Sequence, residues 1–226
     1  MIQISGLEKY YTMSHEKLLV LALEHLQVAK GEQAAVTGPS GCGKSTLLHM
    51  VGGVVVPEQG SIVVDGADIT CKNEKERDAY RARQVGYIFQ DFYLIPSMTA
   101  EENVRLVLPA MRKQEQTALL DEWFEKVGLS ERRNHRPGQM SRGQQQRVAI
   151  IRALINKPSV VLADEPTGSL DYETAGMMMD LLLGLCKANG QTLLCVTHDL
   201  PLAERFPRVI RMQECNKAVQ DRRVIA

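Results

Sequence analysis

Residues 38–46 read Gly-Pro-Ser-Gly-Cys-Gly-Lys-Ser-Thr and match the phosphate-loop pattern G-x-x-x-x-G-K-[ST] at every fixed position. The apolar residues 33–37 before the loop predict a strand, and residues 47–51 after it predict the start of a helix. In such a loop the backbone N–H groups converge on phosphate oxygens, and the lysine adds charge between the β- and γ-phosphates. The chain is therefore expected to bind a nucleoside triphosphate.

The composition fits one domain and gives no support to a nucleic-acid partner. Among 226 residues there are 27 Lys plus Arg and 27 Asp plus Glu, so no excess of positive charge is available for a phosphate backbone. The 5 cysteines are scattered and include no C-x-x-C pair, so neither a disulfide framework nor a zinc cluster is expected. A reducing compartment is the simplest location.

No apolar run approaches the roughly 18 residues that cross a bilayer. Residues 1–8 lack the apolar core of a signal peptide, and residues 177–186 are interrupted by Asp180. We therefore expect a soluble chain without direct membrane insertion, whose role at a membrane would come through a partner.

Several short apolar runs end in polar residues, which is typical of buried parallel strands. The runs are residues 33–37, 85–89, 160–163 and 192–197. The polar residues that follow them are Lys44, Gln90, Asp164 with Glu165, and His198. Because ligands in open α/β sheets bind outside the carboxyl ends of the strands, these side chains are expected at one rim.

Helical periodicity replaces the strand pattern over residues 91–157 and predicts a mostly helical insertion. Before it, the alternation at residues 61–65 and the turn at Gly66 predict an antiparallel β layer. The predicted fold is α/β with a mostly parallel sheet, organised as a single domain. It comprises residues 1–226, with the core and β layer at 1–90 and 158–226 and a helical subdomain at 91–157.

The strand at residues 160–163 is followed by two adjacent carboxylates, Asp164 and Glu165. We expect Asp164 to reach Mg²⁺, directly or through water, and Glu165 to orient and deprotonate the attacking water. A strand that simply ends in two solvated acids is the alternative. The phosphate loop upstream argues against that alternative.

Residues 140–144 read Met-Ser-Arg-Gly-Gln and are followed by Gln-Gln-Arg-Val-Ala. With the phosphate loop and the acidic pair, this segment resembles the Leu-Ser-Gly-Gly-Gln signature of ATP-binding-cassette (ABC) ATPases, which have a P-loop NTPase core. The resemblance covers the whole chain. It also identifies Gln90 as the Q-loop glutamine, residues 169–171 as the D-loop and His198 as the switch histidine.

The resemblance implies a set of residues for ATP and Mg²⁺. The catalytic residues would be Glu165, His198 and Lys44, and the Mg²⁺ ligands would be Ser45, Gln90 and Asp164. The residues implied to bind ATP are Tyr11, Gly38, Ser40, Gly41, Cys42, Gly43, Lys44, Ser45, Thr46, Gln90, Ser141, Gly143, Gln144 and Asp171. Tyr11 would stack on adenine, although adjacent Tyr10 could take that place and a tyrosine here could also simply pack.

The family also implies a second copy of the chain. Its domains dimerise head to tail and sandwich two ATP molecules, so that the signature of one copy meets the γ-phosphate held by the other. Because Ser141 is expected to begin a helix, its hydroxyl, the Gly143 N–H and the helix dipole would form an anion site. One copy alone should hydrolyse ATP poorly.

Arg142 replaces the first glycine of the common signature. It places a cation in the first turn of a helix, against the helix dipole, yet near the phosphates of the opposing ATP. Since arginine does not favour positive φ, we expect a helical backbone at this position. Met140 in place of leucine is a nearly isosteric change and should matter little.

Within the family, residues 89–96, 99–104, 134–137 and 162–171 are similar to the branch of lipoprotein-releasing, macrolide-exporting and division-associated ATPases (LolD, MacB and FtsE types). This resemblance implies an ATP-hydrolysing subunit that energises a separate integral membrane permease, by mechanotransmission or by export of lipoprotein, peptide or drug. The subunit would be cytoplasmic and peripheral on the inner face of the cell membrane. The alternative is an FtsE-like ATP-dependent regulator of a cell-envelope or division complex that transports nothing.

Residues 92–95 read Phe-Tyr-Leu-Ile and form an apolar cluster directly after the Q-loop. These side chains either pack into the helical insertion or form a groove for a coupling helix of the membrane partner. The sequence leaves both possibilities open.

Overall fold

Five parallel strands form the central sheet in the order β6-β7-β8-β3-β9. The computed structural model of the chain describes residues 2–13 and 16–224. The strands are β6 (Val85–Ile88), β7 (Val160–Asp164), β8 (Thr192–Val196), β3 (Gln33–Thr37) and β9 (Arg208–Arg211). The first four confirm the predicted strands, whereas the edge strand β9 was not predicted. Because β9 pairs with β3, the strand before the phosphate loop lies inside the sheet.

Apolar side chains cover both faces of the parallel sheet. In β3, Ala34 and Val36 belong to the cluster that contains helix α1 (Lys44–Val51), whereas Ala35 belongs to the cluster on the opposite face. Strands β7 and β8 alternate in the same way. Burial on both faces explains why these strands are nearly continuous apolar runs in the sequence.

A second, antiparallel sheet has the order β2-β1-β4-β5. It consists of β1 (Ile2–Met13), β2 (Glu16–Val28), β4 (Gln59–Val64) and β5 (Ala67–Asp68). Asp65 and Gly66, both with positive φ (48° and 81°), turn the chain between β4 and β5, as the alternating pattern predicted. The antiparallel layer is therefore confirmed, and the long β1–β2 hairpin makes up most of it.

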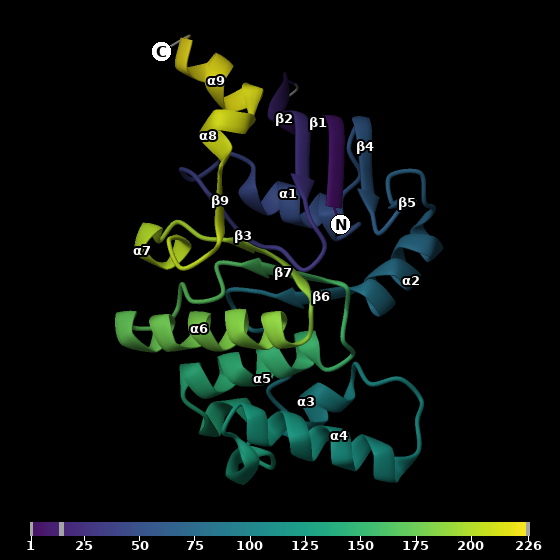
Figure 1. The fold of residues 1–226 in the computed structure, drawn as a ribbon, viewed down its shortest axis with the longest axis vertical. Coiled ribbons are helices and arrows are strands. Elements are labelled where there is room, and N and C mark those ends of the chain that lie inside the picture. Colours follow the sequence, from purple (N-terminus) through teal and green to yellow (C-terminus); the bar gives the residue numbers. More distant parts are fainter. Residues whose placement is uncertain (1, 14–15, 225–226) are drawn as a thin grey trace.

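The helices separate into groups around the two sheets, and Figure 1 shows α1 between them. On the other side of the parallel sheet, α6, α5, α3 and α4 are stacked outward from it. The remaining helices are α2 (Glu74–Gln84), α3 (Ala100–Arg105), α4 (Lys113–Lys126), α5 (Arg142–Leu154), α6 (Tyr172–Ala188), α7 (Leu200–Ala203), α8 (Met212–Cys215) and α9 (Lys217–Val224). Among the described residues, no helix combines the length and apolar character that a bilayer span requires.

Helices α3, α4 and α5 confirm the helical character of the insertion. One apolar cluster joins Trp123 and Phe124 of α4 to Val148 and Ile151 of α5 and continues into α6 and the sheet. Gly86 of β6 makes this packing close, because a Cβ there would lie 2.2 Å from the Ala153 carbonyl oxygen. Since this cluster is shared with the sheet, the separate subdomain at 91–157 stays a prediction.

Candidate nucleotide-binding site

The phosphate loop lies between the carboxyl end of β3 and the start of α1. Gly43 has a φ of 90° and immediately precedes the helix. A Cβ at this position would lie 2.9 Å from the Leu21 Cδ1 atom and 3.1 Å from the Val20 carbonyl oxygen, both on β2. Glycine is therefore required both for the left-handed turn and for the close approach of β2.

Lys44 is held underneath this loop. The residue is 9% exposed, and its Nζ donates to the carbonyl oxygens of Gly38 at 2.8 Å and Pro39 at 3.0 Å. A buried ammonium group needs hydrogen-bond partners, and the loop carbonyls provide them. The charge is thus fixed at the place where phosphate oxygens are expected.

Two oxygen-bearing side chains meet beside the loop. The Ser45 hydroxyl at the start of α1 donates to Oδ1 of Asp164 at 3.1 Å. Asp164 is the last residue of β7, so the sheet brings together residues that are 119 positions apart in the chain. Hydroxyl and carboxylate oxygens are the ligands that Mg²⁺ prefers, so this pair fits the predicted metal site.

Glu165 and His198 also line the site and lie beside each other. His198 Nδ1 lies 2.8 Å from Glu165 Oε1. Glu165 adopts a φ of 47°, which is rare for a residue with a side chain, and its N–H donates to the Val196 carbonyl at 3.0 Å. Strained backbone of this kind occurs where the surrounding structure fixes a functional side chain.

These groups surround a cavity of about 330 Å³. Its lining residues are Val20, Ser40, Gly41, Gly43, Lys44, Ser45, Thr46, Glu165, Val196 and His198. The predicted phosphate-loop residues, Glu165 and His198 therefore meet in one place, with Asp164 reaching it through Ser45. Val20 and Val196 were not predicted as site residues, since an apolar residue on a strand carries no recognisable signal for a ligand.

Two other phosphate-loop residues support the cavity from its edges. Gly38 supplies a carbonyl to Lys44, and Cys42 is 2% exposed within the apolar cluster around α1. The Cys42 side chain points into the core, so only its backbone could contact a nucleotide, and its role in binding stays a prediction.

Three predicted ligands lie outside the residues that line this cavity. Tyr11 is 40% exposed on β1, and Lys9 Nζ lies 5.4 Å from the centre of its ring. The exposed Gln90 amide borders Gly168 in the loop after Glu165, where a Cβ on Gly168 would be 3.3 Å from Gln90 Nε2. Asp171 caps α6, with Oδ1 accepting from the Thr174 N–H at 3.0 Å.

The signature residues also lie outside the lining of the cavity. Ser141 is the N-cap of α5, as predicted, and its Oγ accepts from the Gln144 N–H at 3.3 Å. In return, Gln144 Oε1 accepts from the Ser141 N–H at 2.9 Å. This capping box leaves the first turn of α5, including Gly143, at the surface of the chain.

Arg142 begins α5 with helical backbone, as predicted. Its guanidinium carbon lies 5.6 Å from the centre of the Phe92 ring. A cation–π contact therefore joins the start of the signature helix to the segment after the Q-loop. The expected proximity of Arg142 to the phosphates of an opposing ATP concerns a second copy and stays a prediction.

The sequence model of the family described as "ABC transporter" matches residues 23–168. The chain belongs to the ABC transporter family. As an ABC ATPase it binds and hydrolyses ATP, and it represents the ATP-binding subunit of a transporter.

Individual ABC proteins resemble it over nearly their whole length. The ABC transporter ATP-binding protein YknY of Bacillus subtilis is 39% identical over 218 residues, covering 96% of this chain and 94% of YknY. The lipoprotein-releasing system ATP-binding protein LolD of Pseudomonas fluorescens is 43% identical over 215 residues, covering 92% of each chain. The dimeric ABC cassette MJ0796 with ADP and Pi has a TM-score of 0.85 and 37% identity, covering 93% of this chain and 94% of that one.

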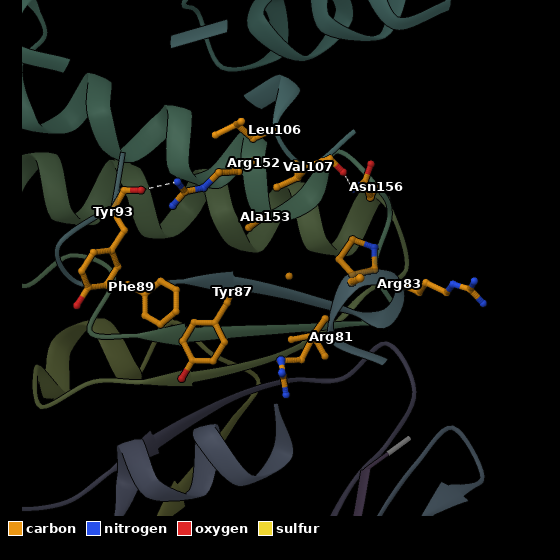
Figure 2. A pocket seen from close by; sticks show the side chains of 14 residues that line it. Arg81, Arg83, Tyr87, Phe89, Tyr93, Leu106, Val107, Arg152, Ala153 and Asn156 are labelled. Carbon is orange, nitrogen blue, oxygen red and sulfur yellow. Dashed lines mark hydrogen bonds between the residues drawn. The ribbon is translucent and has the colours of Figure 1, made fainter. Parts of the chain in front are cut away.

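A second cavity of this ABC ATPase, of about 580 Å³, lies between β6 and α5 (Figure 2). The rings of Tyr87, Phe89 and Tyr93 form a row along it, with centroids 4.1 Å apart for the first pair and 5.0 Å for the second. Tyr93 is 62% exposed. This cavity is therefore an aromatic groove that is open to solvent at Tyr93.

Arg152 of α5 holds the loop at one end of this groove. Its guanidinium donates to the Tyr93 carbonyl at 2.6 Å and also to the Phe92 carbonyl, and burial lowers the pKa of the guanidinium. Phe92 and Tyr93 both have positive φ, 56° and 45°. The two hydrogen bonds explain how this uncommon backbone is maintained.

Proposed function

We propose that this chain hydrolyses Mg²⁺-bound ATP as a head-to-tail dimer and thereby drives a separate integral membrane protein. The observation that carries the proposal is the Glu165 carboxylate, which lines the phosphate cavity beside His198. A carboxylate in this position is suited to accept a proton from the attacking water.

The other residues of the cavity would stabilise the phosphates during this step. Lys44 would exchange its loop carbonyls for phosphate oxygens and neutralise developing charge. Ser45 and Asp164, with Gln90 from the Q-loop, would hold Mg²⁺, which supplies further charge neutralisation when bound. His198 would keep the attacking water and the γ-phosphate in place.

A second copy would complete the site. Ser141 and Gly143 lie outside the cavity of their own chain and are exposed or partly exposed at the start of α5. An exposed helix start is available to an anion on another molecule. The dimeric form of the cassette MJ0796 supports this arrangement.

The aromatic groove is the surface that we assign to the membrane partner. Within residues 92–95, Phe92 is 4% exposed and Leu94 packs against the main apolar cluster, so these two pack internally. Tyr93 and Ile95 are 62% and 39% exposed and remain available for docking. On this proposal both interpretations of residues 92–95 apply. Phe92 and Leu94 pack internally, whereas Tyr93 and Ile95 would contact the partner.

Charge complementarity indicates the kind of partner segment that fits the groove. Its described lining residues include Arg81, Arg83 and Arg152 but no carboxylate. Arg83 is exposed and makes no ion pair among the described residues. We propose that the occupant is an amphipathic helix of the membrane protein, with an apolar face on Tyr93 and an acidic side chain toward Arg83.

The relatives support a transport system of the lipoprotein-release type, because LolD of Pseudomonas fluorescens is named as part of such a system. On this proposal the chain would be cytoplasmic and bound peripherally at the inner face of the cell membrane.

The decisive experiment uses Glu165→Gln. We expect hydrolysis to fall by about 100- to 10,000-fold while ATP binding persists, because the substitution removes the base and keeps the shape of the side chain. ATP should then accumulate a dimer in size-exclusion chromatography. Glu131→Gln, an exposed position in the helical region, is the matched control. Unchanged hydrolysis by Glu165→Gln would contradict the proposal.

The same trapped variant can identify the partner. Purified from detergent-solubilised membranes with ATP, it should carry an integral membrane protein with a periplasmic domain that binds lipoprotein. Recovery of a partner whose external domain binds cell-wall hydrolase regulators would instead support the FtsE-like role. Recovery of no membrane protein would count against both.

The groove is tested by Tyr93→Asp. An added carboxylate should repel an acidic helix and abolish the ATPase stimulation by the membrane partner, while basal ATPase stays within about twofold, since Tyr93 lies outside the nucleotide cavity. Met177→Asp, at a position that is 51% exposed on α6, offers a control for surface charge. Equal loss of stimulated and basal activity would refute the assignment.

A further inference from the structure

Asn216, between α8 and α9, is fully buried and has its side-chain amide saturated with hydrogen bonds. Oδ1 accepts from the Ala22 N–H at 2.8 Å and from the Ala218 N–H at 3.2 Å. Nδ2 donates to the Val20 and Cys42 carbonyls, both at 3.0 Å. All four hydrogen-bonding positions of the amide are therefore occupied.

These bonds join three distant segments of the chain. Val20 and Ala22 belong to β2, and Cys42 belongs to the phosphate loop, 174 positions before Asn216. Val20 also lines the nucleotide cavity. One side chain from the C-terminal region thus holds both a wall of the cavity and the loop itself.

The bond to Cys42 has a specific consequence for the phosphate loop. In a trans peptide the carbonyl of one residue and the N–H of the next point in opposite directions. The structure contains no cis peptide bond among the described residues, so fixing the Cys42 carbonyl toward Asn216 turns the Gly43 N–H to the other side. Gly43 lines the nucleotide cavity, where such N–H groups bind phosphate oxygens.

Gly43 needs this external restraint because of its own flexibility. With a φ of 90° and no Cβ, its backbone could adopt many other conformations at little cost. The Leu21 side chain and the Val20 carbonyl restrict it from one side. The Asn216 amide fixes the preceding peptide plane, which neither of those contacts does.

We infer that Asn216 is a positioning residue that pre-orients the Cys42–Gly43 peptide for phosphate binding. It acts through backbone carbonyls and does not touch the nucleotide. The inference rests on the proposed binding of ATP in this cavity and not on the proposed dimer or membrane partner.

The test is Asn216→Asp, which retains an acceptor for Ala22 and Ala218 but loses both donors of Nδ2. We expect the dissociation constant for Mg-ATP, measured by calorimetry well below the melting temperature, to rise about tenfold. Turnover at saturating ATP should stay within about twofold. A role in fold stability alone would lower the melting temperature and leave the dissociation constant unchanged.

Two controls separate positioning from stability. Lys217→Ala removes the adjacent ion pair with Glu24, which also links the C-terminal segment to β2, without touching the loop. Ile62→Ala destabilises the same apolar cluster from β4. Both should keep the wild-type dissociation constant.

A second variant, Asn216→Ser, keeps a single hydroxyl donor and should weaken ATP binding by the same mechanism. An unchanged dissociation constant in a folded Asn216 variant would overturn the inference. Failure of both variants to fold would also overturn it, because Asn216 would then serve the fold and not the loop. Loss of ATP binding in the Ile62→Ala control would show that affinity follows stability and would equally count against it.

Discussion

The nucleotide cavity and the start of α5 would be the two halves of the proposed ATP site, and they differ in how the chain assembles them. At the cavity, the ends of β3, β7 and β8 bring Lys44, Glu165 and His198 together within one copy. At α5, Ser141 and Gln144 bond to each other and stay at the surface. On the proposed function, the assembled cavity would bind ATP in a single copy, whereas the start of α5 would act only on the ATP held by a second copy.

The largest expected effect on this comparison comes from Ser141→Ala. Because Ser141 would act only on the ATP of the other copy, binding by a monomer should stay within about twofold, while hydrolysis should fall about 10- to 100-fold from the loss of a hydrogen bond to a charged group. ATP binding by calorimetry and steady-state ATPase assays separate the two quantities.

Asn73→Ala is a matched control, because Asn73 and Glu76 form the same kind of capping box at α2. Each substitution should cost about 1 kcal/mol of stability through the lost cap. If Asn73→Ala lowered hydrolysis as much as Ser141→Ala, the loss of hydrolysis would result from reduced stability. That outcome would contradict the proposal that Ser141 acts on the ATP of a second copy.

Arg142→Gly should have a smaller effect. It restores the glycine of the common signature and removes the cation from above the Phe92 ring, a contact worth about 0.5–1 kcal/mol at an exposed site. We expect ATP binding to stay intact and turnover to change by less than about tenfold, or 1.4 kcal/mol. Complete loss of ATPase activity in this variant would show that Arg142 is essential for the function of the signature residues at the start of α5.

The smallest effect is a pH dependence at Asp171, the last residue of the predicted D-loop. Hydrogen bonds from the Thr174 backbone lower the pKa of this carboxyl from its ordinary 3.8. The carboxylate therefore stabilises the folded chain above pH 3.8, and this contribution is lost as the pH falls through the lowered pKa.

Thermal melting of wild type and Asp171→Asn should reveal the stability that the ionised Asp171 carboxylate contributes. The wild type should melt at the higher temperature near pH 7, and the difference should shrink as the pH falls below 3.8. Glu173→Gln, on an exposed residue in the first turn of α6, is the control. A difference that stays constant with pH would exclude a charge-dependent cap.

Four of the five parallel strands were predictable because each is a local, mostly apolar run. Strand β9 was not, since its sequence Arg-Val-Ile-Arg is short and charged at both ends. Helix α2 was also missed, because its sequence is almost entirely polar and only Tyr80 is buried. Elements with few buried apolar residues carry less of the pattern on which sequence-based prediction depends.

The same limit applies to individual side chains. Arg142 was predicted to be helical from its type, yet its contact with Phe92 depends on how α5 packs near the Q-loop. Asn216 gave no signal, because an isolated asparagine near the end of a chain is usually a surface residue.

Short motifs in the sequence were enough to predict an ATPase. The phosphate loop, the acidic pair after a strand and the helix-capping signature are each contiguous patterns. The tertiary structure decided which of these patterns share a cavity. It also set the left-handed backbone of Glu165 and the restraint on the Cys42–Gly43 peptide, because both depend on hydrogen bonds between residues far apart in sequence. Such bonds form only when the strands are aligned and the intervening segments are packed.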